Sequence, residues 1–286
     1  MPFGSVDELQ AALRRQTYLT DRGLATVIHL ALALGKPLLL EGEAGVGKTE
    51  VAKVLAPALG RELIRLQCYE GIDAGQALYE WDYSRQLVAA RAPDLHLDDV
   101  KDLFSSEFLV ERPLLAAIRA GSSAVLLIDE LDRADDEFEA FLLETLSEFA
   151  VSIPEIGRVA AMRPPAVVIT SNRTRELHDA LKRRCLYHWI DHPSLEREVE
   201  IVRVRAPEVP EALAREVARV VSRLRDMELA KHPGVAETID WANALNYLGV
   251  AHLDGEVAAG TLGAVIKDHD DEEIVRSRLG EVFERG

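Results

Sequence analysis

The sequence is poor in cysteine and, relative to its acidic content, poor in basic residues. Its two cysteines, Cys68 and Cys185, stand far apart and fit no metal-binding spacing. Such sparse use of cysteine favours a reducing compartment. Lys and Arg number 33 against 49 Asp and Glu, which gives a formal net charge of −16. Because a surface of that sign repels nucleic-acid phosphates, we expect protein partners and no nucleic acid.

Long apolar runs are absent as well. No stretch reaches the roughly 18 apolar residues of a membrane-spanning helix. The first residues, MPFGSVDE, lack the basic and apolar segments of a signal peptide. We therefore expect a cytoplasmic protein that does not insert into a membrane. Hydrophobic residues still make up 48% of the chain, enough for a sizeable core.

Short apolar segments alternate with helical patterns over the first two thirds of the chain. Segments typical of buried strands are 38–40, 63–66, 124–128 and 167–170, and helical patterns cover 5–15, 21–34, 48–59, 112–119 and 138–149. This alternation predicts an α/β fold with a parallel sheet between helices, a three-layer αβα domain over 1–190. Beyond it, apolar residues recur at helical spacing, which predicts a smaller all-helical subdomain over 191–286.

One segment fits the phosphate-binding pattern G-x-x-x-x-G-K-[ST]. It consists of Gly42, Glu43, Ala44, Gly45, Val46, Gly47, Lys48 and Thr49, and lies between a predicted strand and a predicted helix. The glycines let backbone N–H groups turn toward phosphate oxygens, and the helix adds its positive N-terminal end. Lys48 is expected to reach the terminal phosphates and the Thr49 hydroxyl to bind Mg²⁺. The segment therefore predicts a site for ATP with Mg²⁺.

Polar residues follow two of the other predicted strands. Asp129 and Glu130 come directly after one apolar segment, and Asn172 lies just beyond another. Parallel sheets bind ligands at the carboxyl ends of their strands. Asp129 is therefore expected to hold Mg²⁺ and Glu130 to polarise the attacking water. Asn172 could bridge that water and the terminal phosphate, although an Asn at this place also serves as an ordinary turn cap.

Two arginines belong to a basic triplet beyond the last of these strands. Arg183 or Arg184 could reach into the nucleotide site of a neighbouring subunit and stabilise charge on the transferring phosphoryl group. A basic triplet alone is more often a solvated face. The sequence leaves open both the role and the choice between the two arginines.

Together these motifs resemble those of the MoxR family of AAA+ ATPases. The matching residues are 42–49 (Walker A), 126–130 (Walker B), Asn172 (sensor 1) and Arg184 (arginine finger), with Arg183 close to the same position; an insert at about 70–111 and a hairpin at 149–161 fit as well. The resemblance implies a P-loop NTPase fold with a helical lid and a hexameric ring that hydrolyses ATP. It further implies chaperone-like remodelling or metal-cofactor maturation of a protein client, with a von Willebrand factor A domain protein as partner. Within the family, the insert looks most like that of members associated with carbon monoxide dehydrogenase-type maturation.

One position departs from the family pattern. Members usually carry a sensor 2 arginine early in a lid helix, and here Asp240 stands in its place. Because an acidic side chain cannot pair with phosphate, a nucleotide-gated scaffold with little hydrolysis remains an alternative. A P-loop small-molecule kinase is another, which the Asp129–Glu130 pair and the helical C-terminal part disfavour.

The insert itself is acidic. Residues 72–99 contain Asp73, Glu80, Asp82, Asp94, Asp98 and Asp99 against Arg85 and Arg91. This balance argues against tracking a phosphate backbone. Trp81 and Tyr83 of the insert could line a ring's pore or a docking face, or pack against their own hairpin.

Overall fold

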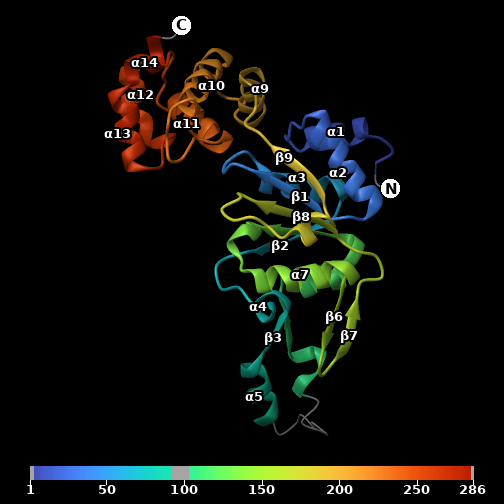
Figure 1. Ribbon diagram of the computed structural model, residues 1–286. Coiled ribbons are helices and arrows are strands. Elements are labelled where there is room, and N and C mark those ends of the chain that lie inside the picture. Colours follow the sequence, from blue (N-terminus) through green and yellow to red (C-terminus); the bar gives the residue numbers. More distant parts are fainter. Residues whose placement is uncertain (1–2, 92–102, 285–286) are drawn as a thin grey trace. The chain divides into compact units, whose positions relative to one another are not determined.

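The computed structural model describes residues 3–91 and 103–284 (Figure 1). The chain divides into two compact units. Unit 1 comprises Met1–Gln16, Thr20–Glu41 and Thr49–Trp189, and unit 2 comprises Thr17–Leu19, Gly42–Lys48 and Ile190–Gly286. Among the described residues, no helix is long and apolar enough to cross a membrane.

A five-stranded sheet forms the centre of unit 1. Its strands are β1 (Leu38–Gly42), β2 (Glu62–Gln67), β5 (Ala124–Asp129), β8 (Ala166–Ser171) and β9 (Leu186–Ile190), in the order β2-β5-β8-β1-β9. The pairs β1–β8, β2–β5 and β5–β8 are parallel. The four strands expected from the sequence are therefore confirmed. β9 was missed because an edge strand reading LYHWI, with no fully buried residue, carries no apolar run.

Helices cover both faces of this sheet, as expected for the αβα fold (Figure 1). They include α1 (Val6–Arg15), α2 (Arg22–Leu34), α3 (Lys48–Leu59), α6 (Pro113–Ala120), α7 (Asp136–Glu148) and the short α8 (Asp179–Lys182). Ser5, Asp21 and Asp135 cap α1, α2 and α7 by accepting a backbone N–H. Leu114 of α6 and Leu142 of α7 pack into one core with strand residues such as Leu126. This core fixes the end of β5, where the candidate carboxylates lie.

The edge strand β2 differs from its neighbours. β1 and β5 are buried along their whole length, whereas β2 is exposed or half-buried at every residue except Leu66. The sequence suggested a strand buried on both faces, and this is wrong for β2, which lies at the edge of the sheet formed by the described strands. Polar side chains such as Arg65 can therefore extend from β2 along the edge of the sheet.

The insert and the hairpin are small additions to unit 1. The insert holds α4 (Ala74–Leu78), β3 (Tyr79–Trp81), α5 (Tyr83–Arg91), the 3₁₀ turn Ser106–Phe108 and β4 (Leu109–Glu111); the hairpin is β6 (Ala150–Ile153) with β7 (Gly157–Ala160). Trp81 stacks edge-on with Tyr79 and Phe104, so packing within the insert accounts for it. Tyr83 stays largely exposed. Asp94, Asp98 and Asp99 lie outside the described residues.

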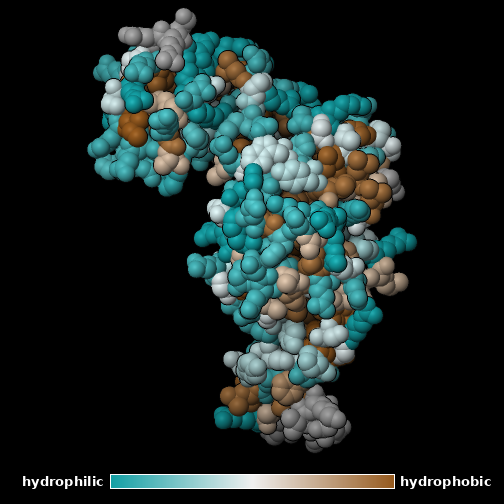
Figure 2. All heavy atoms as spheres, viewed as in Figure 1, coloured by the Kyte–Doolittle hydropathy of each residue, from teal (hydrophilic) through white to brown (hydrophobic). Residues whose placement is uncertain are grey.

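The C-terminal part of unit 2 is mostly helical, as predicted, and the face of it seen in Figure 2 is mostly hydrophilic. Its helices are α9 (Leu195–Arg205), α10 (Glu211–Arg225), α11 (Val235–Tyr247), α12 (Gly255–Thr261), α13 (His269–Ser277) and α14 (Leu279–Glu284). Trp241, fully buried, packs with apolar residues of α10 and α13 such as Val217 and Val275. One ion pair is buried in this bundle. The guanidinium of Arg225 binds both carboxylate oxygens of Glu198 at 2.7 Å, and Thr238 donates to the same carboxylate.

Candidate nucleotide site

The phosphate-binding loop connects β1 to α3. Gly45 (φ +79°) and Gly47 (φ +96°) adopt backbone conformations that side chains other than glycine rarely take, so the loop can curl tightly. Lys48, buried at the start of α3, donates from Nζ to the carbonyl oxygens of Gly42 (2.8 Å) and Glu43 (2.5 Å). The loop thus holds its ammonium group among its own carbonyls, beside the backbone that would take up phosphate.

The carboxyl end of β5 carries a buried carboxylate with hydroxyl partners. Asp129 is 1% exposed, and its Oδ1 accepts from the hydroxyls of Thr49 (2.8 Å) and Thr170 (2.6 Å). Carboxylate and hydroxyl oxygens are the hard ligands that Mg²⁺ prefers. The donor set therefore fits Mg²⁺, with Thr49 and Asp129 as the residues that would hold it. The structure brings these two predicted residues together although 80 positions separate them.

Two residues of β2 complete this end of the sheet. Arg65 donates to Asp129 Oδ2 from Nε (3.0 Å) and Nη2 (2.5 Å), and Nη2 also donates to Gln67. Gln67 in turn donates to Glu130 Oε2 at 3.1 Å. Sequence reasoning missed both residues. The available signal was that alternate residues of a strand share a face, so Arg65 and Gln67 point the same way beside the end of β5.

Glu130 is held in an unusual backbone conformation. Its φ of +55° lies in the left-handed region, which costs energy for a residue with a side chain. The Glu130 N–H donates to the Thr170 hydroxyl (2.9 Å), and its carboxylate pairs with Arg133 at 3.2 Å. The carboxylate is 35% exposed. This conformation turns the chain sharply after Asp129 and leaves Glu130 accessible to solvent.

The segment that follows β8 is fixed to the segment that follows β5. Asp132, 3% exposed, accepts the backbone N–H groups of Asn172 (3.1 Å) and Thr174 (2.9 Å). It also accepts the Thr174 hydroxyl at 2.7 Å. Asn172 is therefore anchored to the segment after β5 through its backbone N–H. The structure brings Asn172, Asp129 and Glu130 to neighbouring strand ends.

The two candidate finger arginines differ in their contacts. Arg184 donates from Nη1 to the carbonyl of Leu143 (2.8 Å) and to the Ser147 hydroxyl, both on α7. Arg183 is exposed and, within residues 3–91 and 103–284, makes no side-chain hydrogen bond or ion pair. Neither lies among the residues around Asp129, as expected if the group acts on another subunit. Arg184 is thus tied to α7 of its own unit, whereas the side chain of Arg183 is exposed.

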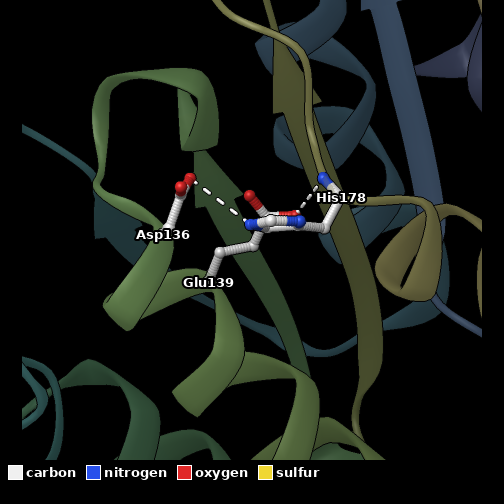
Figure 3. A group of neighbouring side chains, drawn as sticks. All are labelled: Asp136, Glu139 and His178. Carbon is white, nitrogen blue, oxygen red and sulfur yellow. Dashed lines mark hydrogen bonds and ion pairs between the residues drawn. The ribbon is translucent and has the colours of Figure 1, made fainter.

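A second group of polar side chains, on α7 and just after β8, is a structural brace. Figure 3 shows the His178 backbone N–H directed at Glu139 (2.6 Å) and its imidazole directed at Asp136 (3.4 Å). The side chains of Asp136, Glu139 and His178 lie close enough together to hold one metal ion. However, the guanidinium of Arg175 already pairs with Glu139 (2.9 Å) and Asp136 (3.4 Å). A cation is therefore already supplied by the chain, and the group anchors residues 175–178 on α7.

Within unit 2, the phosphate-binding loop contacts the segment before α9 and the start of α11. The Val235 N–H at the start of α11 donates to the Gly45 carbonyl at 3.0 Å. Glu43 accepts from His192 at 3.1 Å. Burial first, and then the charge of Arg225, lower the pKa of His192 below its ordinary value. Asp240 is exposed on α11.

Comparisons with known proteins agree on the fold. Residues 37–185, more than half of the chain, match the family model "AAA domain (dynein-related subfamily)". Two mutants of the Thermotoga maritima protein RuvB superpose with TM-scores of 0.53 and 0.51 at 16% and 18% identity. They cover 99% of this chain, and 79% and 80% of the RuvB chains. At such low identity, the likeness shows a shared fold alone.

Two curated relatives align with this chain over part of their own length. The gas vesicle ATPase GvpN1 of Halobacterium salinarum is 24% identical over 205 residues, and the ClpA homolog protein of Fuscovulum blasticum 25% identical over 289. The matches cover 68% and 92% of this chain but only 58% and 33% of those proteins. With its Walker A loop, its Asp129–Glu130 pair and its match over residues 37–185, the chain belongs to the dynein-related subfamily of AAA domains, an AAA+ ATPase class that uses ATP with Mg²⁺.

Proposed function

We propose that this chain hydrolyses ATP through residues 42–49, Asp129, Glu130 and Asn172. Residues 42–49 would bind the phosphates, and Thr49 with Asp129 would hold Mg²⁺, which offsets phosphate charge when bound. Glu130 would take the proton of the attacking water, and Asn172 would orient that water against the terminal phosphate. The observation that carries the proposal is the convergence of Thr49, Asp129 and Glu130 at one end of β5.

The roles of Lys48 and Glu130 can be separated by experiment. Lys48 offers positive charge to the bound nucleotide, so Lys48→Ala should lose ATP binding in calorimetry. Glu130→Gln should bind ATP about as well as the wild type and lose turnover, because the amide cannot accept the proton. Equal nucleotide affinity for wild type and Lys48→Ala would end the assignment of the loop.

The finer function that fits best is that of a MoxR-type machine acting on a protein client. We infer a ring of copies in which 1–190 binds nucleotide, 191–286 acts as the lid and Arg183 reaches the neighbouring site, with Arg184 as the second choice. A von Willebrand factor A domain protein is the expected partner, and metal-cofactor maturation one form of the client's remodelling. The net charge of −16 and the insert of the MoxR pattern support a protein client. Sizing Glu130→Gln protein with ATP by light scattering tests the ring, since a monomer under these conditions would contradict it.

A nucleotide-gated scaffold with little hydrolysis is the second candidate. It is favoured by the contacts of Glu130 with Gln67 (3.1 Å) and Arg133 (3.2 Å), which hold its carboxylate in a fixed place. The exposed Asp240 at the place expected for sensor 2 points the same way. Turnover at micromolar protein decides between the two. If Glu130→Gln does not reduce the rate of ATP turnover, the result supports the nucleotide-gated scaffold.

A further inference from the structure

Asp129 carries a positively charged partner that the nucleotide motifs do not include. Arg65 binds Asp129 Oδ2 through two nitrogens, at 3.0 and 2.5 Å. The two differ strongly in exposure, since the side chain of Asp129, taken by itself, is 2% exposed and that of Arg65 is 48% exposed. One end of the pair is therefore fixed in the core, while the other lies along the open edge of the sheet.

A buried carboxylate is costly unless a cation or several donors compensate its charge. Two hydroxyls satisfy Oδ1, and Arg65 compensates Oδ2. Mg²⁺ bound by the same carboxylate would remove the need for this compensation. The guanidinium and the metal ion would also repel each other at so short a range. Because about half of the Arg65 side chain is exposed to solvent, it can move away from Asp129 without disturbing the packing of the core.

Release of Arg65 from Asp129 would affect Glu130 through Gln67, which contacts both. Arg65 donates to the Gln67 oxygen, and the Gln67 nitrogen donates to Glu130. Arg65 therefore orients the Gln67 amide so that its nitrogen faces Glu130. Without Arg65, the Gln67 oxygen loses this donor, and of its other contacts the amide keeps only a long hydrogen bond to the Cys68 carbonyl (3.3 Å), so the contact with Glu130 weakens.

We propose that Arg65 is a built-in counter-ion of Asp129 that Mg²⁺ displaces, and that its displacement loosens the Gln67 contact which holds Glu130. Arg65 is thus a positioning residue that makes the readiness of Glu130 depend on metal binding. The proposal rests on the assignment of Asp129 to Mg²⁺ above. It also gives a physical reason for placing an arginine on an otherwise exposed edge strand.

The test measures metal affinity directly, with Mn²⁺ as a spectroscopic substitute for Mg²⁺. Free Mn²⁺ is followed by electron paramagnetic resonance as it is titrated into the full chain with saturating ADP. Arg65→Gln removes the competing charge, so we expect Mn²⁺ to bind about fivefold more tightly, the scale of a partly exposed ion pair. Arg65→Lys keeps the charge and should stay close to the wild type. Arg158→Gln, which removes the 2.8 Å pair between Arg158 of the hairpin and Glu148 at the end of α7, should have no effect.

The sign of the change decides the outcome. Unchanged or weaker Mn²⁺ binding by Arg65→Gln would overturn the proposal, and weaker binding would instead indicate that Arg65 contacts phosphate. A fluorescent ADP analogue in EDTA separates this from failure of the nucleotide site, because that failure abolishes binding in the wild type as well. If Arg65→Gln does not fold, the Mn²⁺ affinities of Arg65→Lys and Arg65→Met, compared in the same assay, keep the test open.

Discussion

The two units each bury a carboxylate against an arginine, but in opposite ways. In unit 2, Glu198 is 0% exposed and Arg225 is 9% exposed, and the pair is joined by two bonds of 2.7 Å. In unit 1, Asp129 is equally buried, but Arg65 is 48% exposed and shares its donors with Gln67. The first pair is enclosed by protein on both sides. The second is enclosed on one side only, which leaves its arginine replaceable.

The same type of ion pair therefore has a different role in each unit. Arg225 also donates to the carbonyl of Pro233, and Thr238 donates to Glu198, so nearly every group of the pair has a fixed partner inside unit 2. Such a pair ties α9, α10 and α11 together. The pair at β5 leaves room for exchange with solvent or metal, which is what a nucleotide site requires. A buried acidic residue is thus a functional candidate when its counter-ion is exposed.

The largest expected effect concerns the exposed arginines at the end of α8. We expect Arg183→Ala to lower ATP turnover about 10³-fold, because a finger arginine stabilises charge on the transferring phosphoryl group. Arg184→Ala should lower it far less, since Arg184 binds α7 of its own subunit. Turnover rates of the two variants at equal oligomer content make the comparison.

Mixing variants shows whether the arginine acts between subunits. Glu130→Gln and Arg183→Ala protein, each inactive alone, should recover activity when mixed, because some interfaces then combine an intact Glu130 with an intact Arg183. Absence of recovery in proven mixed oligomers would contradict action on a neighbour. A larger loss for Arg184→Ala than for Arg183→Ala would reverse the assignment.

The next prediction compares how much each of the two ion pairs contributes to stability. Arg225→Met leaves Glu198 buried without its cation, so we expect the free energy of unfolding to fall by about 3–5 kcal/mol. Arg65→Gln should cost less than this, because the guanidinium is half-exposed and the Thr49 and Thr170 hydroxyls still donate to Asp129. Urea unfolding of both variants in EDTA measures this. Equal losses would show that the Arg65 pair is as structural as the Arg225 pair.

The sequence predicted the parts of the site whose chemistry depends on short spacing. The loop 42–49 and the pair Asp129–Glu130 are recognisable because phosphate and metal binding need those residue types at those positions. Strands β1, β5 and β8 were predictable because both of their faces are buried, and β2 because Leu63, Ile64 and Leu66 form an apolar segment. β9 and the polar course of β2 were not, because an edge strand needs no apolar run.

The partners of those motifs were beyond the reach of the sequence. Arg65 and Gln67 become relevant only once β2 is known to lie beside β5, and strand order is not written in any local pattern. Asp132 was missed for a similar reason, since its role depends on accepting N–H groups 40 and 42 residues away. The preference for Arg183 proposed above likewise rests on the contacts of Arg184 with α7, which the sequence does not reveal.

A smaller effect is expected on the pH dependence of stability, from the partly buried His192 of unit 2. Burial and Arg225 lower the pKa of His192, while Glu43 and Glu198 oppose the shift. The unfolded chain therefore takes up this proton at a higher pH than the folded chain does. Stability that is complete above the ordinary histidine pKa of about 6.5 should fall as the pH drops below it. His192→Gln should remove this part of the decline in melting temperature between pH 8 and 5.5; an unaltered decline would contradict it.

The smallest expected effect is the response to nucleic acid, which we predict to be nil. Among described residues, Arg85 of the insert pairs with Glu107 (2.9 Å), and Arg112, just after the insert, pairs with Glu80 (2.7 Å). A surface that binds a phosphate backbone needs several unpaired Lys or Arg to release counterions. ATP turnover should therefore stay unchanged when single- or double-stranded DNA or RNA is added at about 150 mM salt.

A charge-altered variant makes this result informative. Glu80→Lys with Glu107→Lys reverses two insert charges and releases both arginines, so weak DNA binding should appear in fluorescence anisotropy and fade as salt rises. If the wild type binds DNA as well as this variant does, the acidic insert is not what keeps nucleic acid away. A several-fold stimulation of the wild type by DNA would go further, because it would move the working surface of unit 1 from a protein client to a nucleic acid.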